Sequence, residues 1–379
     1  MAHTYDSFTS TLPIDLRSKL FHEDIARQLV EKYGPVFTKY TGNKPIVYVC
    51  NQQLANQVFN STEYDFDDPE LKLIKYFLHD FPKETDDKIH IWEASAVMRF
   101  LDRKLIARQT ESIGKFKSMI IEKFTEHYRD YNPEAIERDI CDSLITAKNQ
   151  AISAGKQSAQ YLTDQNLAIC IYEMLVGGAE GAESTFRWLL LFMAYYPEVQ
   201  QKLRHEVATV IGVGGGDRLP RHEDRDSCHY TMAFISEIMR FRTISPDGNP
   251  HKVLIDSKLG NYTIPKDTTV NVYQGIVMRN DDPNYWSRGL DFMPERFLDE
   301  SDGHYRKPSA AYIPFGSGIR KCLGDKFVYS EMFLILVRLI QRTHRYDIVL
   351  ATHNGIGINA AINDFCLPYD YTIQLKLRE

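Results

Sequence analysis

The chain has 379 residues, of which 43% are hydrophobic and 25% are charged, and 51 acidic side chains outweigh 45 basic ones to give a formal net charge of −6. This composition is typical of a globular protein with a large core, and it excludes collagen-like and low-complexity chains. The negative charge argues against a nucleic-acid-binding protein, and six widely spaced cysteines do not resemble a secreted disulfide framework.

The first third of the chain mixes helical and strand-like patterns. We expect a helix over residues 22–32, a buried strand over 45–50 and mostly helical structure over 69–148, where the segment 116–124 has apolar residues at helical spacing. That helix should end at the Tyr-Asn-Pro-Glu segment, 131–134. The chain begins without a basic or an apolar leader segment, so no signal peptide is predicted.

The second part contains the longest predicted helix. It runs over 163–196 and ends at Pro197, which begins another helix. Its apolar stretch is interrupted by Glu173, Glu180, Glu183 and Arg187, so it is not expected to span a bilayer. The long helix is followed by a glycine-rich loop over 212–216 and a helix over 231–241. We then expect a hairpin region over 253–277 that turns around 264–268, and an apolar helix over 325–342.

The middle of the long helix contains Gly177, Gly178 and Gly181. Each glycine inside a helix costs about 1 kcal/mol relative to alanine, so three of them need a compensating reason. Close packing of another helix is the better explanation from the residues alone, and close approach of a flat ligand is the alternative.

The segment 314–324 is the most informative part of the sequence. Cys322 follows a glycine-rich loop and directly precedes the apolar helix, and both the loop amides and the helix N-terminus favour a thiolate there. A single thiolate with no nearby cysteine or histidine does not suit zinc, but it suits axial ligation of haem iron. A buried, inert cysteine would leave the surrounding glycines and Arg320 unexplained.

The pattern Phe315-x-x-Gly318-x-Arg320-x-Cys322-x-Gly324 resembles the haem-binding signature of the cytochrome P-450 family. Five fixed residue types at roughly one in twenty each match by chance in about one of ten thousand such chains. Two companion motifs occur in the family's order, namely Glu237-x-x-Arg240 and the Pro294-Glu-Arg296-Phe segment. The most similar branch is the microsomal one, which includes steroid and xenobiotic hydroxylases.

This resemblance implies a mainly α, single P-450 domain over residues 1–379, with a long central helix over the haem and small β-sheets. It implies that Cys322 ligates the iron of haem b, that Arg320 and His251 pair with the haem propionates, and that Phe315, Gly318 and Gly178 contact the cofactor. It also implies a structural ion-pair triad of Glu237, Arg240 and Arg296.

Two features depart from the family pattern. Glu180 aligns with the family's oxygen-side acid, but Gly181 stands where a threonine is usual, so Ser184 and Thr185 are the candidate catalytic hydroxyls together with Glu180. The resemblance also leads us to expect that the chain lacks the family's N-terminal anchor and that the fold is incomplete between about residues 60 and 65. Trp92 is expected to belong to a helix that follows this gap.

The resemblance implies a haem-thiolate monooxygenase that oxidises a lipophilic small molecule, such as a steroid, a fatty acid or a xenobiotic, with O₂ and electrons from an NADPH-dependent reductase. Full-length relatives are associated with the cytosolic face of the endoplasmic reticulum membrane, whereas this chain without an anchor could be cytoplasmic. Two alternatives remain, a haem-thiolate isomerase or peroxygenase that needs no reductase, and a truncated product without catalytic activity.

Overall fold

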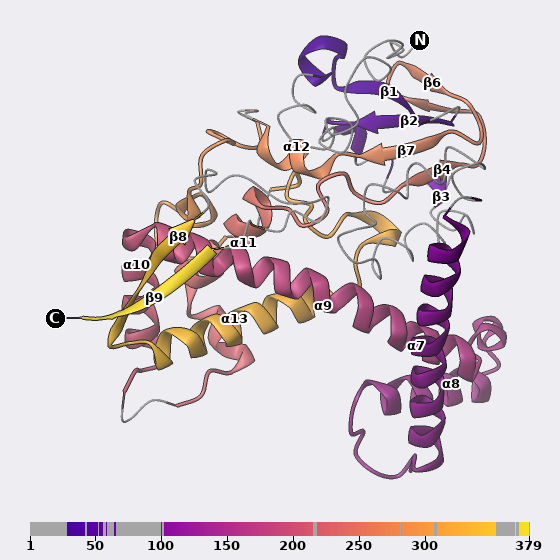
Figure 1. Cartoon of the computed structure of the whole chain (residues 1–379), viewed down its shortest axis with the longest axis horizontal. Coiled ribbons are helices and arrows are strands. Elements are labelled where there is room, and N and C mark those ends of the chain that lie inside the picture. The colour runs from indigo at the N-terminus through magenta and orange to yellow at the C-terminus, as the bar shows by residue number, and fades with distance from the viewer. Residues whose placement is uncertain are drawn as a thin grey trace. The chain divides into compact units, whose positions relative to one another are not determined.

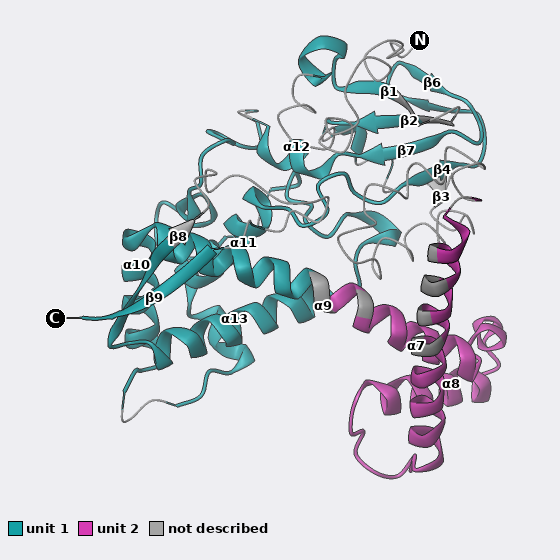
Figure 2. Ribbon diagram, viewed as in Figure 1, with its two compact units in different colours: residues 1–72, 181–379 teal, residues 73–180 magenta. Residues whose placement is uncertain are grey.

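The structure is a computed structural model that describes residues 29–41, 44–51, 53–55, 58, 64–65, 100, 102–214, 218–280, 282, 284–306, 309–353, 368 and 371–378. The chain forms two compact units, residues 1–72 with 181–379 (unit 1) and residues 73–180 (unit 2), as Figure 2 shows. The boundary lies within one long helix, and the expectation of a single domain over 1–379 stays a prediction.

Unit 2 is helical in its described part. It contains α7 (Arg103–Arg129), α8 (Ile140–Ser153), a short 3-10 helix (Gln157–Tyr161) and the first part of α9 (Asp164–Tyr195). Phe124, Ile145, Leu167 and Ala168 from these three α-helices form its buried core. The Asp139 side chain caps α8 by accepting hydrogen bonds from the backbone amides of Cys141 and Asp142.

The helices of unit 1 are the rest of α9, α10 (Pro197–Val210), α11 (His229–Phe241), α12 (Gln274–Arg279) and α13 (Asp325–Arg342), drawn in Figure 1. Trp188 and Phe192 of α9 share one buried core with residues of α10, α11 and α13, including Phe234 and Phe333. Strands β8 (Tyr346–His353) and β9 (Tyr371–Leu377) form an antiparallel pair in the same unit.

A five-stranded sheet completes unit 1, in the order β1 (Val36–Thr41), β2 (Lys44–Val49), β7 (Thr269–Val272), β4 (His251–Val253) and β3 (Tyr64–Asp65). Only the β2–β7 pairing of this sheet is parallel among the described residues. A separate antiparallel hairpin consists of β5 (Ser257–Leu259) and β6 (Tyr262–Ile264).

Most predicted elements are confirmed. The long helix ends before Pro197, which occupies the first turn of α10, and α13 has the predicted bounds. The described chain is mainly helical with small sheets, as the family resemblance implies. Predictions over 22–28 and 69–99, including the one for Trp92, concern residues outside the described part.

The predicted hairpin over 253–277 is partly wrong. The turn lies at Gly260 and Asn261, where Gly260 has a φ of 58° that favours glycine, and 265–268 instead connects β6 to β7. Residues 274–277 belong to α12, whose residues up to Met278 are all buried. A short segment whose residues are all buried has no alternation of polar and apolar residues. Its sequence pattern therefore cannot distinguish a strand from a helix.

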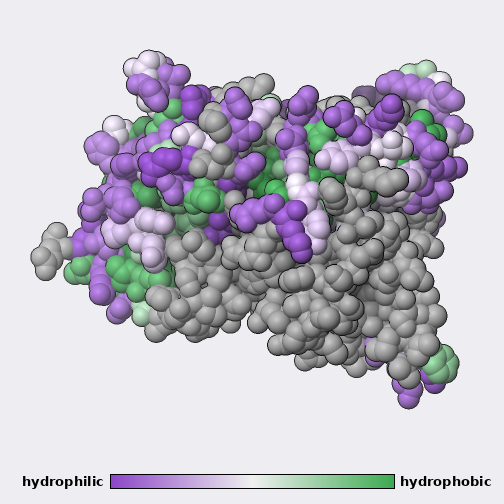
Figure 3. All heavy atoms as spheres, turned by 90° about the horizontal axis from the view of Figure 1, so that it is seen from above, coloured by the Kyte–Doolittle hydropathy of each residue, from purple (hydrophilic) through white to green (hydrophobic). Residues whose placement is uncertain are grey.

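Among the described helices, none combines the length and the apolar character that a bilayer crossing requires. On the face shown in Figure 3, hydrophobic residues form small patches among hydrophilic ones.

Candidate haem-thiolate site

The loop before α13 holds Cys322 by backbone geometry. Gly316 and Gly318 have φ angles of 69° and 71°, which a side chain would strain. The Cys322 amide donates a hydrogen bond of 2.9 Å to the Phe315 carbonyl, and residues Gly318–Arg320 form one turn of 3-10 helix between them. The two glycines therefore let the chain fold back so that Cys322 lies at the start of α13.

Helix α13 begins directly after this cysteine. Gly324 is its N-cap, and the amide of Val328 donates the first helical hydrogen bond to the Gly324 carbonyl at 2.9 Å. A Cβ atom at position 324 would lie 3.7 Å from the Cys322 sulfur, an ordinary contact distance. The positive end of the α13 dipole favours an anionic ligand atom at this position.

Large apolar side chains around Cys322 are exposed to solvent. Ile319 is 79% exposed, Leu323 is 90% exposed and Phe327 is 69% exposed, while Cys322 and Arg320 are exposed as well. Such a concentration of exposed apolar surface marks a place that another group covers. A sulfur donor, an arginine and an apolar surface are the features that a haem requires of its site, so these residues fit haem.

The three residues of the predicted ion-pair triad are in direct contact. Glu237 and Arg240 of α11 are fully buried and form a bidentate pair, with 2.7 Å from Arg240 Nε to Glu237 Oε2 and 2.8 Å from Nη2 to Oε1. Arg296 Nε lies 3.1 Å from Glu237 Oε2. Burial lowers the pKa of Arg296, and the Glu237 carboxylate opposes that shift.

Backbone carbonyls complete the network. Arg240 Nη1 donates to the carbonyls of Met278 and Gly289, each at 2.8 Å, and the amide of Met293 donates to Glu237 at 2.8 Å. The network therefore joins α11 to the end of α12 and to the segment that follows. Buried charges require this degree of hydrogen bonding to offset their desolvation.

The remaining predicted cofactor contacts lie in different environments of unit 1. His251 begins β4 and is 3% exposed. Phe315 is half-buried, and its ring packs against that of Tyr329 in α13 at 5.8 Å between centroids. Both residues belong to the same unit as Cys322 and Arg320.

A partly buried tyrosine pair supports Phe315, and the sequence motifs did not indicate it. The hydroxyls of Tyr312 and Tyr329 lie 2.5 Å apart, and burial raises the pKa of both phenols well above the ordinary value. Tyr329 thereby anchors the Phe315 side of the cysteine loop on α13. No residue spacing along the chain could have revealed this pair, because the two tyrosines meet only in the folded chain.

In α9, a Cβ atom built at Gly177, Gly178 or Gly181 meets no described heavy atom within 4 Å. Among the described residues, no other helix packs tightly against these glycines. Thr185 is buried, and its hydroxyl donates a hydrogen bond of 2.8 Å to the Gly181 carbonyl. The structure thus gives the Thr185 hydroxyl a backbone partner.

The other predicted α9 residues are divided between the two units. Ser184 is buried in unit 1, whereas Gly178 and Glu180 belong to unit 2 and the side chain of Glu180 lies outside the described part. Their roles toward oxygen and haem stay predictions.

Comparisons with known proteins agree on the family. The family profile described as Cytochrome P450 matches residues 62–344, more than half of the chain. The chain therefore belongs to the cytochrome P450 family.

Curated relatives include two kinds of P450. The steroid 17-alpha-hydroxylase/17,20 lyase of Gallus gallus is 35% identical over 225 residues, which are 59% of this chain and 43% of that protein. The same enzyme of Felis catus is 29% identical over 318 residues, 83% of this chain and 59% of that protein. Cytochrome P450 2J3 of Rattus norvegicus is 35% identical over 228 residues, 60% of this chain and 43% of that protein. The chain thus spans about half the length of the curated relatives it matches.

Proposed function

We propose that this chain is a haem-thiolate monooxygenase that oxidises a lipophilic small molecule. The observation that carries the proposal is the geometry of the loop 315–324. Two glycines of positive φ and the hydrogen bond from the Cys322 amide to the Phe315 carbonyl shape this loop. Cys322 is thereby exposed at the start of α13, beside exposed apolar side chains. The family membership and the relatives named as steroid hydroxylases support the reaction and favour a steroid as substrate.

Each residue has a role in this proposal. Cys322 holds the iron through its sulfur, Arg320 and His251 bind the propionates of haem b, and Phe315, Gly318 and Gly178 lie against the cofactor. When bound, the haem supplies the redox chemistry that inserts oxygen into the substrate. The buried Glu237–Arg240–Arg296 network fixes α11 and the segments beside it, so that unit 1 keeps its shape.

Family membership supports a proposal for the partner and the location. The electrons come from an NADPH-dependent reductase, and the enzyme works at the cytosolic face of the endoplasmic reticulum membrane.

Glu180 with Ser184 or Thr185 conducts protons to the oxygen side of the haem.

A second function, that of an isomerase or peroxygenase without a reductase, is favoured by one observation. Gly181 offers no hydroxyl, and the Thr185 hydroxyl is bonded to the Gly181 carbonyl, so a proton path from α9 is weakened.

Turnover of a steroid with two oxidant systems distinguishes the functions. Haem-loaded protein is incubated with progesterone and either a P450 reductase with NADPH or hydrogen peroxide, and the products are identified by mass spectrometry. Hydroxylated steroid with reductase and NADPH supports the monooxygenase, while product with peroxide alone supports the second function. No steroid product in either system, from protein that carries haem, contradicts a steroid oxidase.

A further inference from the structure

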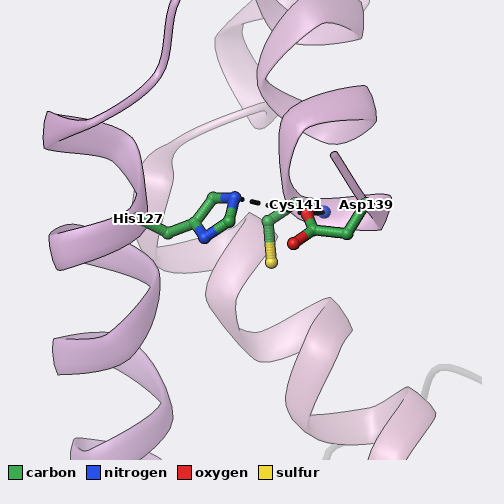
Figure 4. Close-up of side chains that lie close together, drawn as sticks. All are labelled: His127, Asp139 and Cys141. Carbon is green, nitrogen blue, oxygen red and sulfur yellow. Dashed lines mark hydrogen bonds and ion pairs between the residues drawn. The ribbon is translucent and has the colours of Figure 1, made fainter. Parts of the chain in front are cut away.

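A cluster of possible metal ligands in unit 2 includes no residue of the proposed haem site. His127 stands in the last turn of α7, and Asp139 and Cys141 stand at the start of α8. One ligand atom from each, the imidazole nitrogen, a carboxylate oxygen and the sulfur, lies within 4.8 Å of the other two. Figure 4 shows the three side chains converging from the two helices.

The distances are compatible with a small tetrahedral ion. His127 Nε2 lies 3.3 Å from Asp139 Oδ1. Two ligands of a tetrahedral zinc ion, each at about 2.0–2.2 Å from the metal, lie about 3.3–3.5 Å apart. The histidine and the carboxylate therefore already have the separation of a zinc-bound pair, and the Cys141 sulfur lies within 4.8 Å of both ligand atoms.

The donor set selects the type of metal. One nitrogen, one sulfur and one carboxylate oxygen suit a borderline ion such as Zn²⁺, whereas Mg²⁺ and Ca²⁺ prefer oxygen ligands alone. His127 and Cys141 also line a depression of about 330 Å³, together with Ile120, Phe124 and Ile171. Water in this depression can occupy the fourth position of the metal.

The surrounding charges favour a cation. Asp142, 3% exposed, lies 3.0 Å from His127 Nε2 through its Oδ1 and forms a bidentate pair with Arg138. Arg138 Nη2 also lies 3.1 Å from His127 Nε2, so zinc binding requires this guanidinium to move off the nitrogen. The two carboxylates and a Cys141 thiolate carry three negative charges, which balance the two charges of zinc and the one of Arg138.

We infer that His127, Asp139 and Cys141 form a zinc-binding site that joins α7 to α8, with water as the fourth ligand. Binding of zinc to the sulfur releases the proton of the Cys141 thiol to solvent.

Zinc binding is tested by titrating the full chain with Zn²⁺ alone in a calorimeter. We expect one zinc ion per chain at this site, at least tenfold weaker binding in His127→Gln and in Cys141→Ser, and unchanged binding in Cys170→Ser, an exposed cysteine of the same unit. Unchanged zinc binding in Cys141→Ser, or its loss only in Cys322→Ser, overturns the inference.

A second measurement does not depend on variants that unfold. Alkylation of the unmodified chain by iodoacetamide is followed at each cysteine by mass spectrometry, with and without Zn²⁺. The inference requires zinc to slow alkylation of Cys141 at least tenfold while alkylation of Cys170 keeps its rate. Equal rates at Cys141 with and without zinc would refute it.

Discussion

At the scale of residues, both side chains of the Glu237–Arg240 ion pair in unit 1 are fully buried. Arg240 is wholly enclosed, and its nitrogens reach one carboxylate and the carbonyls of Met278 and Gly289. Lysine at this position offers three donors on a flexible stem and cannot form the bidentate contact. The arginine side chain is therefore required by geometry as well as by charge.

Removing one charge of this pair should destabilise the fold strongly. We expect Glu237→Gln to lower the free energy of unfolding by about 3–5 kcal/mol, because it leaves Arg240 and Arg296 buried without their counter-charge. The measurement is urea unfolding followed by circular dichroism. The matched control is Glu126→Gln, which breaks an exposed pair with Lys123 at the same i, i+3 helical spacing and should change stability little. Equal changes in the free energy of unfolding in the two variants would contradict a stabilising role of the buried Glu237 charge.

The Asp142–Arg138 pair predicts a pH dependence with a definite sign. Hydrogen bonds from Arg138 hold the pKa of Asp142 well below its usual range. Asp142 therefore contributes its full stability above the unfolded-state pKa of about 3.9. That contribution is lost as the pH falls through the lower pKa of the folded state.

The stability difference between the unmodified chain and Asp142→Asn should accordingly be full above about pH 5 and should shrink steadily as the pH falls below about 3.9 toward the lower pKa of the folded state. Chemical unfolding of both proteins across this range measures it. A difference that stays the same down to the lowest pH would show that packing, not charge, accounts for the effect.

At the scale of elements, α9 carries glycines that cost helix stability without a packing partner among the described residues. A methyl group meets open space at Gly178, so Gly178→Ala should stabilise the haem-free chain by about 0.5–1 kcal/mol. The same methyl group should weaken haem binding, since Gly178 is proposed to lie against the cofactor.

The matched control is Gly114→Ala in α7, where a Cβ atom also meets nothing within 4 Å. It should stabilise the haem-free chain to a similar extent and leave haem affinity unchanged. Thermal unfolding and haem titration of both variants test this. Equal haem affinity in the two variants would remove Gly178 from the proposed cofactor contacts.

The sequence predicts elements whose cause is local. Pro197 ends one helix and begins the next through its own ring, and the glycines before Cys322 allow the loop through their own φ angles. The carbonyl acceptors of Arg240 lie 38 and 49 residues further along the chain, so no local pattern indicates them. The same holds for His127, which meets Asp139 and Cys141 only when α7 and α8 pack together.

At the scale of the whole molecule, the family profile covers residues 62–344 and therefore includes parts of both compact units. The triad and the cysteine loop lie in unit 1, whereas the first part of α9 with Gly178 and Glu180 lies in unit 2. The proposed cofactor contacts therefore include residues assigned to each unit. Haem binding by the chain is thus the property on which the proposed function depends most directly.

The decisive measurement is the difference spectrum that carbon monoxide produces in the reduced, haem-reconstituted protein. If Cys322 ligates the haem iron, we expect a red-shifted Soret band of the thiolate type in the unmodified chain and in Cys170→Ser, and the loss of that band in Cys322→Ser. Failure of the unmodified chain to take up haem, or the same thiolate band in Cys322→Ser, would contradict this role of Cys322.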